Sequence, residues 1–309
     1  MPRVIITGGT GLIGKRLSQM LIEKGYEVIV FSHQEKGGKT KEGAIIKKWD
    51  INKGEIDKDA IAQADYLVHL AGANVAEKRW TEKRKQEIID SRTKSSALLI
   101  QAMRETPNQI KAVISASAIG WYGEDTVTSK REGFHEDAPA SSDFLGYTTR
   151  LWEESITPVS ALGKRPVILR TGIVLSTKGG ALVEFIKPLK LGVATALGKG
   201  SQMVSWIHID DICRLYLYAI ENNHLAGAYN AVAPSPVTNK ELVTALANEM
   251  KGKKFISLSV PSFVLKLMLG EMSVEILKSA TVSSKKTEQS GFAFLYPDIK
   301  SALHDLIKK

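Results

Sequence analysis

The sequence predicts an α/β protein, in which a Rossmann-type, doubly wound parallel sheet is joined to a smaller C-terminal α+β domain. Three observations support this prediction. A short apolar run near the N-terminus breaks into a glycine-rich turn that leads into an amphipathic helix, and strand-like and helix-like segments alternate over the first two thirds of the chain. The last third is richer in loops. Alternating β and α segments are typical of a parallel sheet with helices on both faces.

The first element is a strand, a glycine turn and a helix in direct succession. Residues 4–6 are apolar, glycines follow at the spacing G-x-x-G-x-x-G, and residues 12–24 have apolar side chains on one helical face. Gly8 permits a tight turn, Gly11 lets a pyrophosphate approach the backbone, and Gly14 lets helix and strand pack closely. The helix N-terminus would offer unpaired N–H groups to the phosphates. The turn therefore predicts a dinucleotide site, or alternatively an α/β protein that has lost its ligand.

The elements that follow alternate in type as far as residue 170. Apolar runs predict strands at residues 27–31, 44–48, 66–70, 111–115 and 166–170. Helices are expected at residues 57–64, 82–104 and 143–162. Thr81 and Ser142 are suited to cap the two longer helices.

The pattern changes after residue 170, where glycines and prolines become frequent. Helices are expected at residues 182–191, 212–221, 261–269 and 297–307, and short strands at 206–211 and 229–232. A capping box of Thr238 and Glu241 begins a further helix, which Gly252 ends. We therefore expect an NAD(P)-binding Rossmann domain over residues 1–170, to which residues 205–232 return. A smaller substrate-side domain would comprise residues 171–204 and 233–309.

Composition and charge exclude several other classes of protein. Among the 309 residues no apolar run approaches the roughly 20 residues of a membrane span. Cys213 is the single cysteine, which excludes an internal disulfide and a cysteine-rich metal site. The net charge of +9 is scattered among acidic residues without interleaved aromatics, so we expect no nucleic acid partner. The first strand begins too early for a signal peptide, and we expect a cytoplasmic protein without membrane contact.

Several longer segments carry a more specific pattern. They are TGGTGLIG (7–14), HLAGA (69–73), RWTEKRKQEIIDSR (79–92), SASAIGWYG (115–123), LRTGIVLSTKGGAL (169–182), SWIHIDDI (205–212), GAYNAVAPSPVTN (227–239), LGEMS (269–273) and SGFAFLYPDIKSAL (290–303). In these segments the sequence resembles the extended short-chain dehydrogenase/reductase superfamily, and more closely its epimerase family branch. The resemblance spans nearly the whole chain, and it implies an NAD(P)-binding domain beside a substrate domain.

The residues after the second strand select between the two nicotinamide cofactors. An acidic residue there would hold the ribose 2′-hydroxyl of NAD, but the chain has Ser32-His33-Gln34, followed by Lys36 and Lys39. A hydroxyl and cations suit a 2′-phosphate, so we expect NADP(H) in preference to NAD(H), unless the lysines belong to a solvated loop. The resemblance implies that Asp50 lies near the adenine and that residues 70–72 follow the ribose. The expected cofactor-binding residues are Gly8, Thr10, Gly11, Leu12, Ile13, Ser32, His33, Asp50, Leu70, Ala71, Gly72 and Arg170.

In the superfamily that the sequence resembles, a Tyr-x-x-x-Lys pair transfers the proton and a Ser or Thr orients the substrate oxygen. Ser117 matches this hydroxyl, whereas the tyrosine position falls on Leu145 and the lysine position on Thr149. Tyr122, in a loop that borders the substrate pocket of relatives, is the expected substitute acid, or alternatively an aromatic wall. Tyr147 is two residues out of register, a rotation of about 200° on a helix, and is better explained as an ordinary packed or partly exposed tyrosine.

Other residues of the resemblance suggest contacts with the substrate. Arg79, Trp80 and Arg92 resemble a family signature that faces the active site, and we expect them to bind an anionic substrate; the alternative is a solvated helix. His208 is followed by two aspartates, but in the superfamily this element is mostly structural, with an Asp capping the next helix. Its spacing suits no metal site, and we expect no metal.

Two functions are consistent with these features. The first is an NADP(H)-dependent oxidoreductase or epimerase-like enzyme that acts on an unidentified small substrate, anionic or nucleotide-linked, without the usual Tyr–Lys pair. The second is a non-catalytic NADP(H)-binding sensor or scaffold protein, which the loss of that pair favours. Relatives use the helices at residues 82–104 and 143–162 as a dimer interface, and their charges here leave a monomer or a homodimer open.

Overall fold

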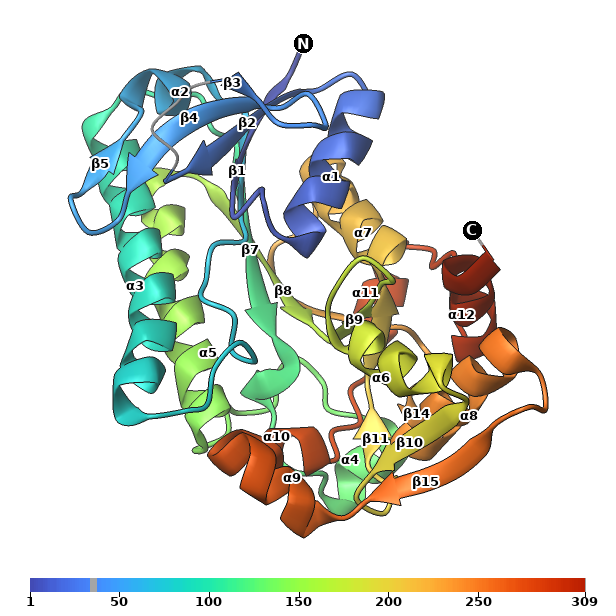
Figure 1. The fold of residues 1–309 in the computed structure, drawn as a ribbon. Helices are drawn as coiled ribbons and strands as arrows, with labels where there is room; N and C mark the ends of the chain where they lie inside the picture. The colour runs from blue at the N-terminus through green and yellow to red at the C-terminus, as the bar shows by residue number, and fades with distance from the viewer. Residues whose placement is uncertain (34–37, 309) are drawn as a thin grey trace.

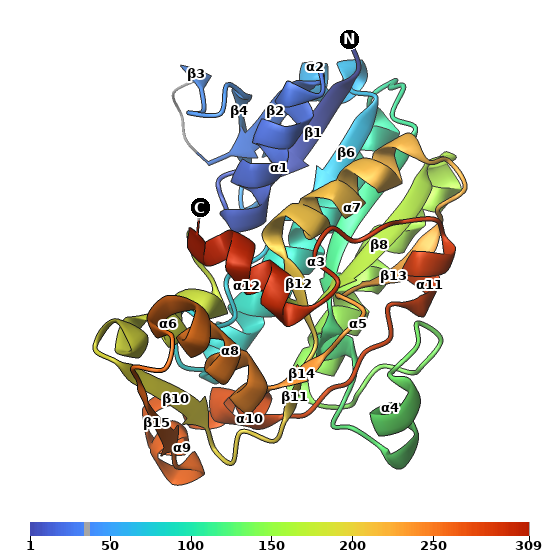
Figure 2. The same cartoon turned by 90° about the vertical axis from the view of Figure 1, so that its right-hand side faces the viewer.

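The computed structural model describes residues 1–33 and 38–308, and a large, mostly parallel sheet runs through it (Figure 2). The strand order is β13-β8-β7-β6-β1-β2-β4-β3, with β5 paired to β4. The strands paired in parallel are β1 (Arg3–Thr7), β2 (Glu27–Ser32), β4 (Ile45–Asp50), β6 (Tyr66–His69), β7 (Ala112–Ala118), β8 (Arg165–Thr171) and β13 (Gly227–Ala231). Two short strands, β3 (Gly38–Lys39) and β5 (Glu55–Ile56), run antiparallel to β4.

The direction of strand addition reverses between β1 and β6. From β1 the chain moves outward through β2 and β4, and then it returns to place β6 on the other side of β1, followed by β7, β8 and β13. The prediction of a doubly wound parallel sheet is therefore confirmed. In such sheets, ligands bind outside the carboxyl ends of the strands at the point of reversal, which here lies between the ends of β1 and β6.

Helices cover both faces of the sheet (Figure 1). One face carries α1 (Leu12–Glu23) and α7 (Ile209–Glu221), and the other carries α2 (Lys58–Gln63), α3 (Glu82–Glu105) and α5 (Phe144–Ile156). The strand β1 shows why both faces need cover: Val4 and Ile6 point into one apolar cluster, and Ile5 points into the other. All three side chains are fully buried.

A third apolar cluster lies beyond the carboxyl ends of the strands, around Leu182, Trp206, Leu246 and Leu303. Its main elements are α6 (Ala181–Lys190), β10 (Val193–Leu197), α8 (Asn239–Lys251), β15 (Ile256–Val260) and α12 (Ile299–Lys308). The short strands β9 (Ile173–Leu175), β11 (Met203–Val204), β12 (Trp206–His208) and β14 (Val237–Thr238) link this region to the sheet. The remaining helices are α4 (Val127–Glu132), α9 (Ser262–Leu269), α10 (Ser273–Leu277) and α11 (Lys285–Gln289). The expected domain boundaries stay a prediction.

Two expected elements end earlier than the sequence indicated. The helix expected over residues 143–162 ends at Ile156 and continues as a 3₁₀ turn, because Pro158 has no N–H to donate and its ring collides with the carbonyl four residues earlier. The strand expected over residues 206–211 ends at His208, which caps α7. In the residues described here, no helix is both long enough and apolar enough to cross a membrane.

Candidate functional site

The β1–α1 turn is shaped by its backbone. Gly8 has a φ of 69°, and a Cβ atom there would lie 2.9 Å from the carbonyl group of Leu70. A Cβ atom on Gly14 would lie 2.5 Å from the Gly8 carbonyl oxygen. Gly11 is the N-cap of α1, so no side chain caps the helix, and its first turn contains no acidic residue. The turn thus forms a cradle at a helix N-terminus, the arrangement that suits a bound phosphate.

The segment after β6 is fixed against this turn by a buried polar group. Thr7 Oγ1 accepts hydrogen bonds from the backbone N–H groups of Leu70 and Ala71, both at 3.2 Å. The same oxygen lies 2.7 Å from His69 Nδ1, and the Ser95 hydroxyl of α3 lies 3.2 Å from His69 Nε2. Burial lowers the pKa of His69 to about 3, so its ring is neutral at physiological pH. The segment predicted to follow the ribose therefore lies at the point of strand reversal.

The end of β2 was predicted to choose between the two cofactors. Ser32 is half-buried and His33 is exposed, with the imidazole ring 6.2 Å from the ring of Trp49. Gln34 and Lys36 lie outside the described residues, and Lys39 is exposed on β3. Neither of the residues described directly after Phe31 carries a carboxylate. Asp50 accepts hydrogen bonds from the N–H groups of Asn52 and Lys53, in a turn that follows β4.

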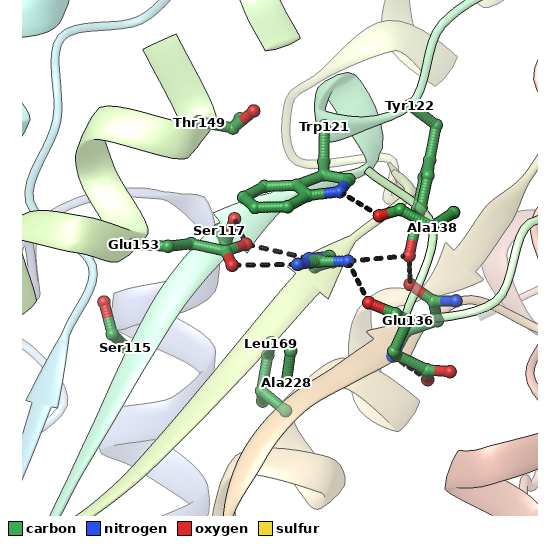
Figure 3. Close-up of polar contacts among 12 residues, drawn as sticks. Ser115, Ser117, Trp121, Tyr122, Glu136, Ala138, Thr149, Glu153, Leu169 and Ala228 are labelled. Atoms are coloured by element: carbon green, nitrogen blue, oxygen red, sulfur yellow. Dashed lines mark hydrogen bonds and ion pairs between the residues drawn. The ribbon is translucent and has the colours of Figure 1, made fainter. Parts of the chain in front are cut away.

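A buried ion pair lies across the carboxyl ends of β7 and β8 (Figure 3). Ser117 on β7 donates its hydroxyl proton to Glu153 Oε1 at 2.6 Å. Arg170 on β8 donates to the same carboxylate through Nε at 2.8 Å and Nη2 at 3.0 Å. All three residues are buried. The two carboxylate oxygens of Glu153 thus accept hydrogen bonds from side chains on two neighbouring strands. Its contact with Arg170 is a bidentate arginine–carboxylate pair.

The other side of the guanidinium is also held by the protein. Arg170 Nη1 donates to the Tyr122 hydroxyl at 3.1 Å and to the Glu136 carbonyl at 2.9 Å. Its Cζ lies 3.7 Å from the centroid of the Trp121 ring. Arg170 was expected to bind the cofactor. Because these contacts engage both terminal nitrogens and Nε, they favour a structural tie over direct contact with a dinucleotide.

Tyr122 was predicted to be the substitute acid, and the structure buries it completely. Its hydroxyl donates to Asn230 Oδ1 at 2.7 Å, and its ring stacks on Phe134 at 5.0 Å. Burial outweighs the nearby charge of Arg170 and raises the pKa of Tyr122 to about 12. A tyrosine with these partners has no open path to a substrate, so the geometry favours the alternative interpretation, an aromatic wall.

The helix α5 presents no other acid at the positions where the superfamily carries its Tyr–Lys pair. Leu145 faces Gly120, and the Thr149 hydroxyl donates to the Leu145 carbonyl at 2.8 Å. Tyr147 is 45% exposed, with the Arg150 guanidinium 5.3 Å from its ring. Tyr147 is thus an ordinary surface tyrosine, as its register indicated.

The three residues expected to bind an anionic substrate do not converge. Arg79 is exposed and donates to the Leu267 carbonyl of α9 at 3.3 Å. Trp80 donates to the Val75 carbonyl at 2.8 Å. Arg92 lies elsewhere, on the third turn of α3, next to the segment that follows β6. The first two side chains hold the loop before α3, and Arg92 is the one placed near the expected cofactor path.

His208 has a structural position. It is buried, and its Nδ1 accepts the backbone N–H of Asp210 at 3.0 Å, so the cap of α7 is a histidine where an aspartate was expected. Asp211 accepts the N–H groups of Leu295 and Tyr296, both at 2.9 Å, and so attaches the C-terminal segment to α7. Within residues 1–33 and 38–308, no group of three or more His, Cys, Asp and Glu side chains is placed to hold a metal ion.

Three residues of the buried cluster were missed by sequence reasoning: Glu153, Glu136 and Asn230. Glu153 lies four residues after Thr149, and Asn230 lies in the quoted segment GAYNAVAPSPVTN. Their partners are distant in sequence, because Ser117 is 36 residues from Glu153 and Tyr122 is 108 residues from Asn230. Spacing along the chain therefore gave no signal for these pairs.

Comparisons with known proteins agree with this geometry. Residues 4–232 match the NAD dependent epimerase/dehydratase family, and residues 260–306 match a domain of unknown function named DUF1731. The epimerase family protein YfhF of Bacillus subtilis (strain 168) is 37% identical over 308 residues, which cover 98% of this chain and 97% of that protein.

Solved structures give the same picture. The crystal structure of the human epimerase family protein SDR39U1 with NADPH matches with a TM-score of 0.85 at 29% identity and covers 99% of both chains. UDP-glucose 4-epimerase from Thermotoga maritima, solved with UDP-glucose, matches with a TM-score of 0.79 at 21% identity, over 99% of this chain and 97% of that one. The second match shows a shared fold.

Proposed function

The chain belongs to the NAD dependent epimerase/dehydratase family, and on that premise we propose that it is an NADP(H)-dependent oxidoreductase or epimerase-like enzyme that acts on a small anionic substrate. One observation carries the proposal: the glycine cradle of the β1–α1 turn is intact and lies against Leu70 and Ala71 at the point of strand reversal. A Cβ atom at Gly8 or Gly14 would collide with the backbone that forms this cradle. Backbone N–H groups at an uncapped helix N-terminus are suited to a pyrophosphate.

The residues around the cradle fit NADP(H) better than NAD(H). A nicotinamide cofactor, when bound, supplies or accepts a hydride. Gly8, Gly11 and the first turn of α1 would hold its phosphates, and Ser32 and His33, whose own side chains carry no carboxylate, would face the adenosine ribose. The human relative with NADPH in its crystal structure supports this preference.

Of the two expected catalytic residues, Ser117 lies at the carboxyl end of β7, on the edge of the sheet where doubly wound folds form their ligand crevice. Its proton lies on the hydrogen bond to Glu153, so its oxygen can offer lone pairs to a donor group of the substrate. Arg170 holds Glu153 in place through a buried ion pair. Since α5 presents no Tyr–Lys pair, the proton that the substrate gains or loses would be exchanged with water. Glu153 and Arg170 are positioning residues in this scheme.

The missing pair also favours a second candidate function, a non-catalytic NADP(H)-binding sensor or scaffold protein. Such a protein needs the cradle but no acid, and α5 has Leu145 and Thr149 where the acid and its lysine would be. It would bind NADPH tightly without turnover, and its affinity for a partner would change with the redox state of the cofactor, as linkage requires.

Titration of the purified protein with NADPH and with NADH, followed by nucleotide fluorescence, tests the cofactor. We expect the wild type to bind NADPH more tightly than NADH. Ser32→Asp should lower the ratio of NADPH affinity to NADH affinity at least tenfold, because the added carboxylate repels the 2′-phosphate. Ser160→Asp adds the same charge at an exposed position away from β2 and should change neither affinity. Equal affinity for both nucleotides in the wild type would overturn the NADP(H) preference, and absence of binding would overturn both functions.

A screen for oxidation of bound NADPH by carbonyl compounds and sugar nucleotides then separates the two functions. Turnover with any anionic substrate establishes an enzyme. Tight binding without turnover across the screen establishes the sensor or scaffold in its place.

A further inference from the structure

Arg92 is a half-buried cation, and no described residue gives it an acidic partner. Its Nη1 donates to the carbonyl oxygens of Ala73 at 3.2 Å and of Ile88 at 2.9 Å. Over residues 1–33 and 38–308, no carboxylate lies within ion-pair distance of its guanidinium, and neither Nη2 nor Nε has an acceptor. The Nη2 and Nε donors are thus free to bind a ligand.

The other arginines in the same part of the molecule are compensated. Arg84, two turns earlier on α3, pairs with Glu77 and Glu87, and Arg170 pairs with Glu153. Burial, with a smaller contribution from the charge of Arg84, lowers the pKa of Arg92 to about 10, so the group remains cationic at neutral pH. A buried charge that the protein itself does not neutralise is costly. A ligand that brings a negative charge would remove that cost.

A second donor beside Arg92 also lacks an acceptor. The Arg92 guanidinium carbon lies 4.8 Å from the centroid of the Trp152 ring. Trp152 is 5% exposed, and its indole Nε1 has no hydrogen-bond partner in the described residues. Buried indole N–H groups usually find an acceptor. The described residues thus leave donors without an acceptor on two neighbouring side chains, the Arg92 guanidinium and the Trp152 indole.

The position of this pair connects it to the proposed cofactor path. A Cβ atom on Gly72 would lie 3.1 Å from the Arg92 guanidinium carbon, so the arginine lies directly against the segment that follows β6. Trp152 is one helical turn after Thr149, the position where the superfamily carries its lysine. Arg92 therefore lies beside the segment that the cofactor is proposed to follow, and the Trp152 ring lies against Arg92.

We propose that Arg92 and Trp152 form a binding subsite for an oxyanion, a carboxylate or phosphate group, which accepts from the guanidinium and the indole N–H. The planar fork of an arginine matches both groups. The inference rests on the proposed function, because it specifies the ligand of that same crevice. The oxyanion belongs either to the substrate or to the phosphates of the cofactor, and the experiment below distinguishes these two sources.

The test is isothermal titration calorimetry with sodium malonate and with inorganic phosphate, at constant ionic strength, on the full chain with and without saturating NADP⁺. We expect saturable binding by the wild type. Arg92→Gln should weaken it at least tenfold, and Trp152→Phe, which keeps an aromatic ring under the guanidinium, about fivefold for one lost hydrogen bond. Arg104→Gln, which removes an exposed cation from the same helix, is the matched control and should leave the affinity unchanged.

The outcomes assign the source of the oxyanion. Anion binding that persists with NADP⁺ bound assigns the subsite to the substrate. Anion binding that NADP⁺ abolishes, together with weaker NADP⁺ binding by Arg92→Gln, assigns it to the cofactor. Absence of saturable binding by the wild type, or equal losses in Arg92→Gln and Arg104→Gln, would overturn the proposal. If Arg92→Gln fails to fold by circular dichroism, Trp152→Phe decides. Titration of the free protein does not depend on NADP⁺, so failure of the proposed function is recognised separately.

Discussion

The two sides of the crevice are built by different means. On the β1–α1 side, the backbone conformation makes the site. Gly8 adopts a positive φ, and a side chain at position 14 would collide with the backbone of the turn. On the α5 side, polar side chains from three separate elements meet: Ser117 of β7 binds Glu153 of α5, which forms a buried ion pair with Arg170 of β8. The comparison teaches that the glycine cradle can be present while α5 lacks the usual Tyr–Lys pair, because the cradle is formed by backbone and does not depend on the side chains of α5.

Breaking the ion pair is the strongest way to test this separation. Glu153→Gln leaves the buried guanidinium of Arg170 without its counter-charge, and we expect the free energy of unfolding to fall by about 3–5 kcal/mol. Chemical denaturation followed by circular dichroism measures the loss. NADPH affinity of the folded variant should remain within a factor of two of the wild type, since Glu153 contacts no residue of the β1–α1 turn.

The neighbouring residue supplies the control. Glu154 pairs with Arg150 on the exposed face of α5, and Glu154→Gln should lower the free energy of unfolding by less than about 0.5 kcal/mol. Equal losses in the two variants would mean that burial does not govern the pair. A large loss of NADPH affinity in Glu153→Gln alone would show that the two sides are coupled.

The second test changes the glycine cradle of the β1–α1 turn. Gly8→Ala places a methyl group against the Leu70 carbonyl at a positive φ, and we expect a loss of about 1–3 kcal/mol in stability and at least a tenfold loss in NADPH affinity. Gly25→Ala is the control, because Gly25 also has a positive φ but a Cβ there meets nothing within 4 Å. Nucleotide fluorescence and denaturation measure both variants. The side-chain cluster on α5 should be unaffected, and wild-type NADPH affinity in Gly8→Ala would contradict the assignment of the cradle.

The same contrast explains which features could be predicted from the sequence. The turn between β1 and α1 was predictable because residues 4–24 form it alone, and the parallel sheet followed from the alternation of short apolar runs and helical patterns. The early end of α5 was missed although Pro158 is visible in the sequence, because the 3₁₀ turn after Ile156 continues the helical pattern.

The buried cluster was not predictable from local patterns. Ser117 was recognised by its resemblance, but its partner Glu153 comes from another element, and the direction of Arg170 depends on the pleat of β8. The sequence placed Arg170 at the end of a strand, where a ligand contact is expected. In the structure the Arg170 guanidinium instead contacts Trp121 and Glu153. Interactions between distant elements decide side-chain roles that a motif leaves open.

The pH dependence of the free energy of unfolding tests His69, which lies between the β1–α1 turn and α3. Since burial lowers the pKa of His69 to about 3, the unfolded chain binds a proton there below about pH 6.5 and the folded chain does not. Stability from this group is therefore complete above pH 6.5 and is lost as the pH falls, at about 1.4 kcal/mol per pH unit. His69→Asn should remove this part of the slope between pH 5.5 and 4.5, and exposed His304→Asn should not. An unchanged slope in His69→Asn would mean that His69 is protonated in the folded protein.

The smallest expected effect tests whether the α5 side contains any acid at all. Tyr122→Phe removes one hydroxyl from the buried cluster, and we expect the free energy of unfolding to fall by about 1 kcal/mol because Asn230 Oδ1 loses its donor. Turnover, in any assay that detects it, should not change, since the hydroxyl is enclosed and its pKa is raised to about 12. Tyr147→Phe, at an exposed position, controls for loss of a phenol. Abolished turnover in a stable Tyr122→Phe protein would show that Tyr122 is the acid after all. It would also connect the ion pair to the reaction, because Arg170 donates hydrogen bonds both to the Tyr122 hydroxyl and to Glu153.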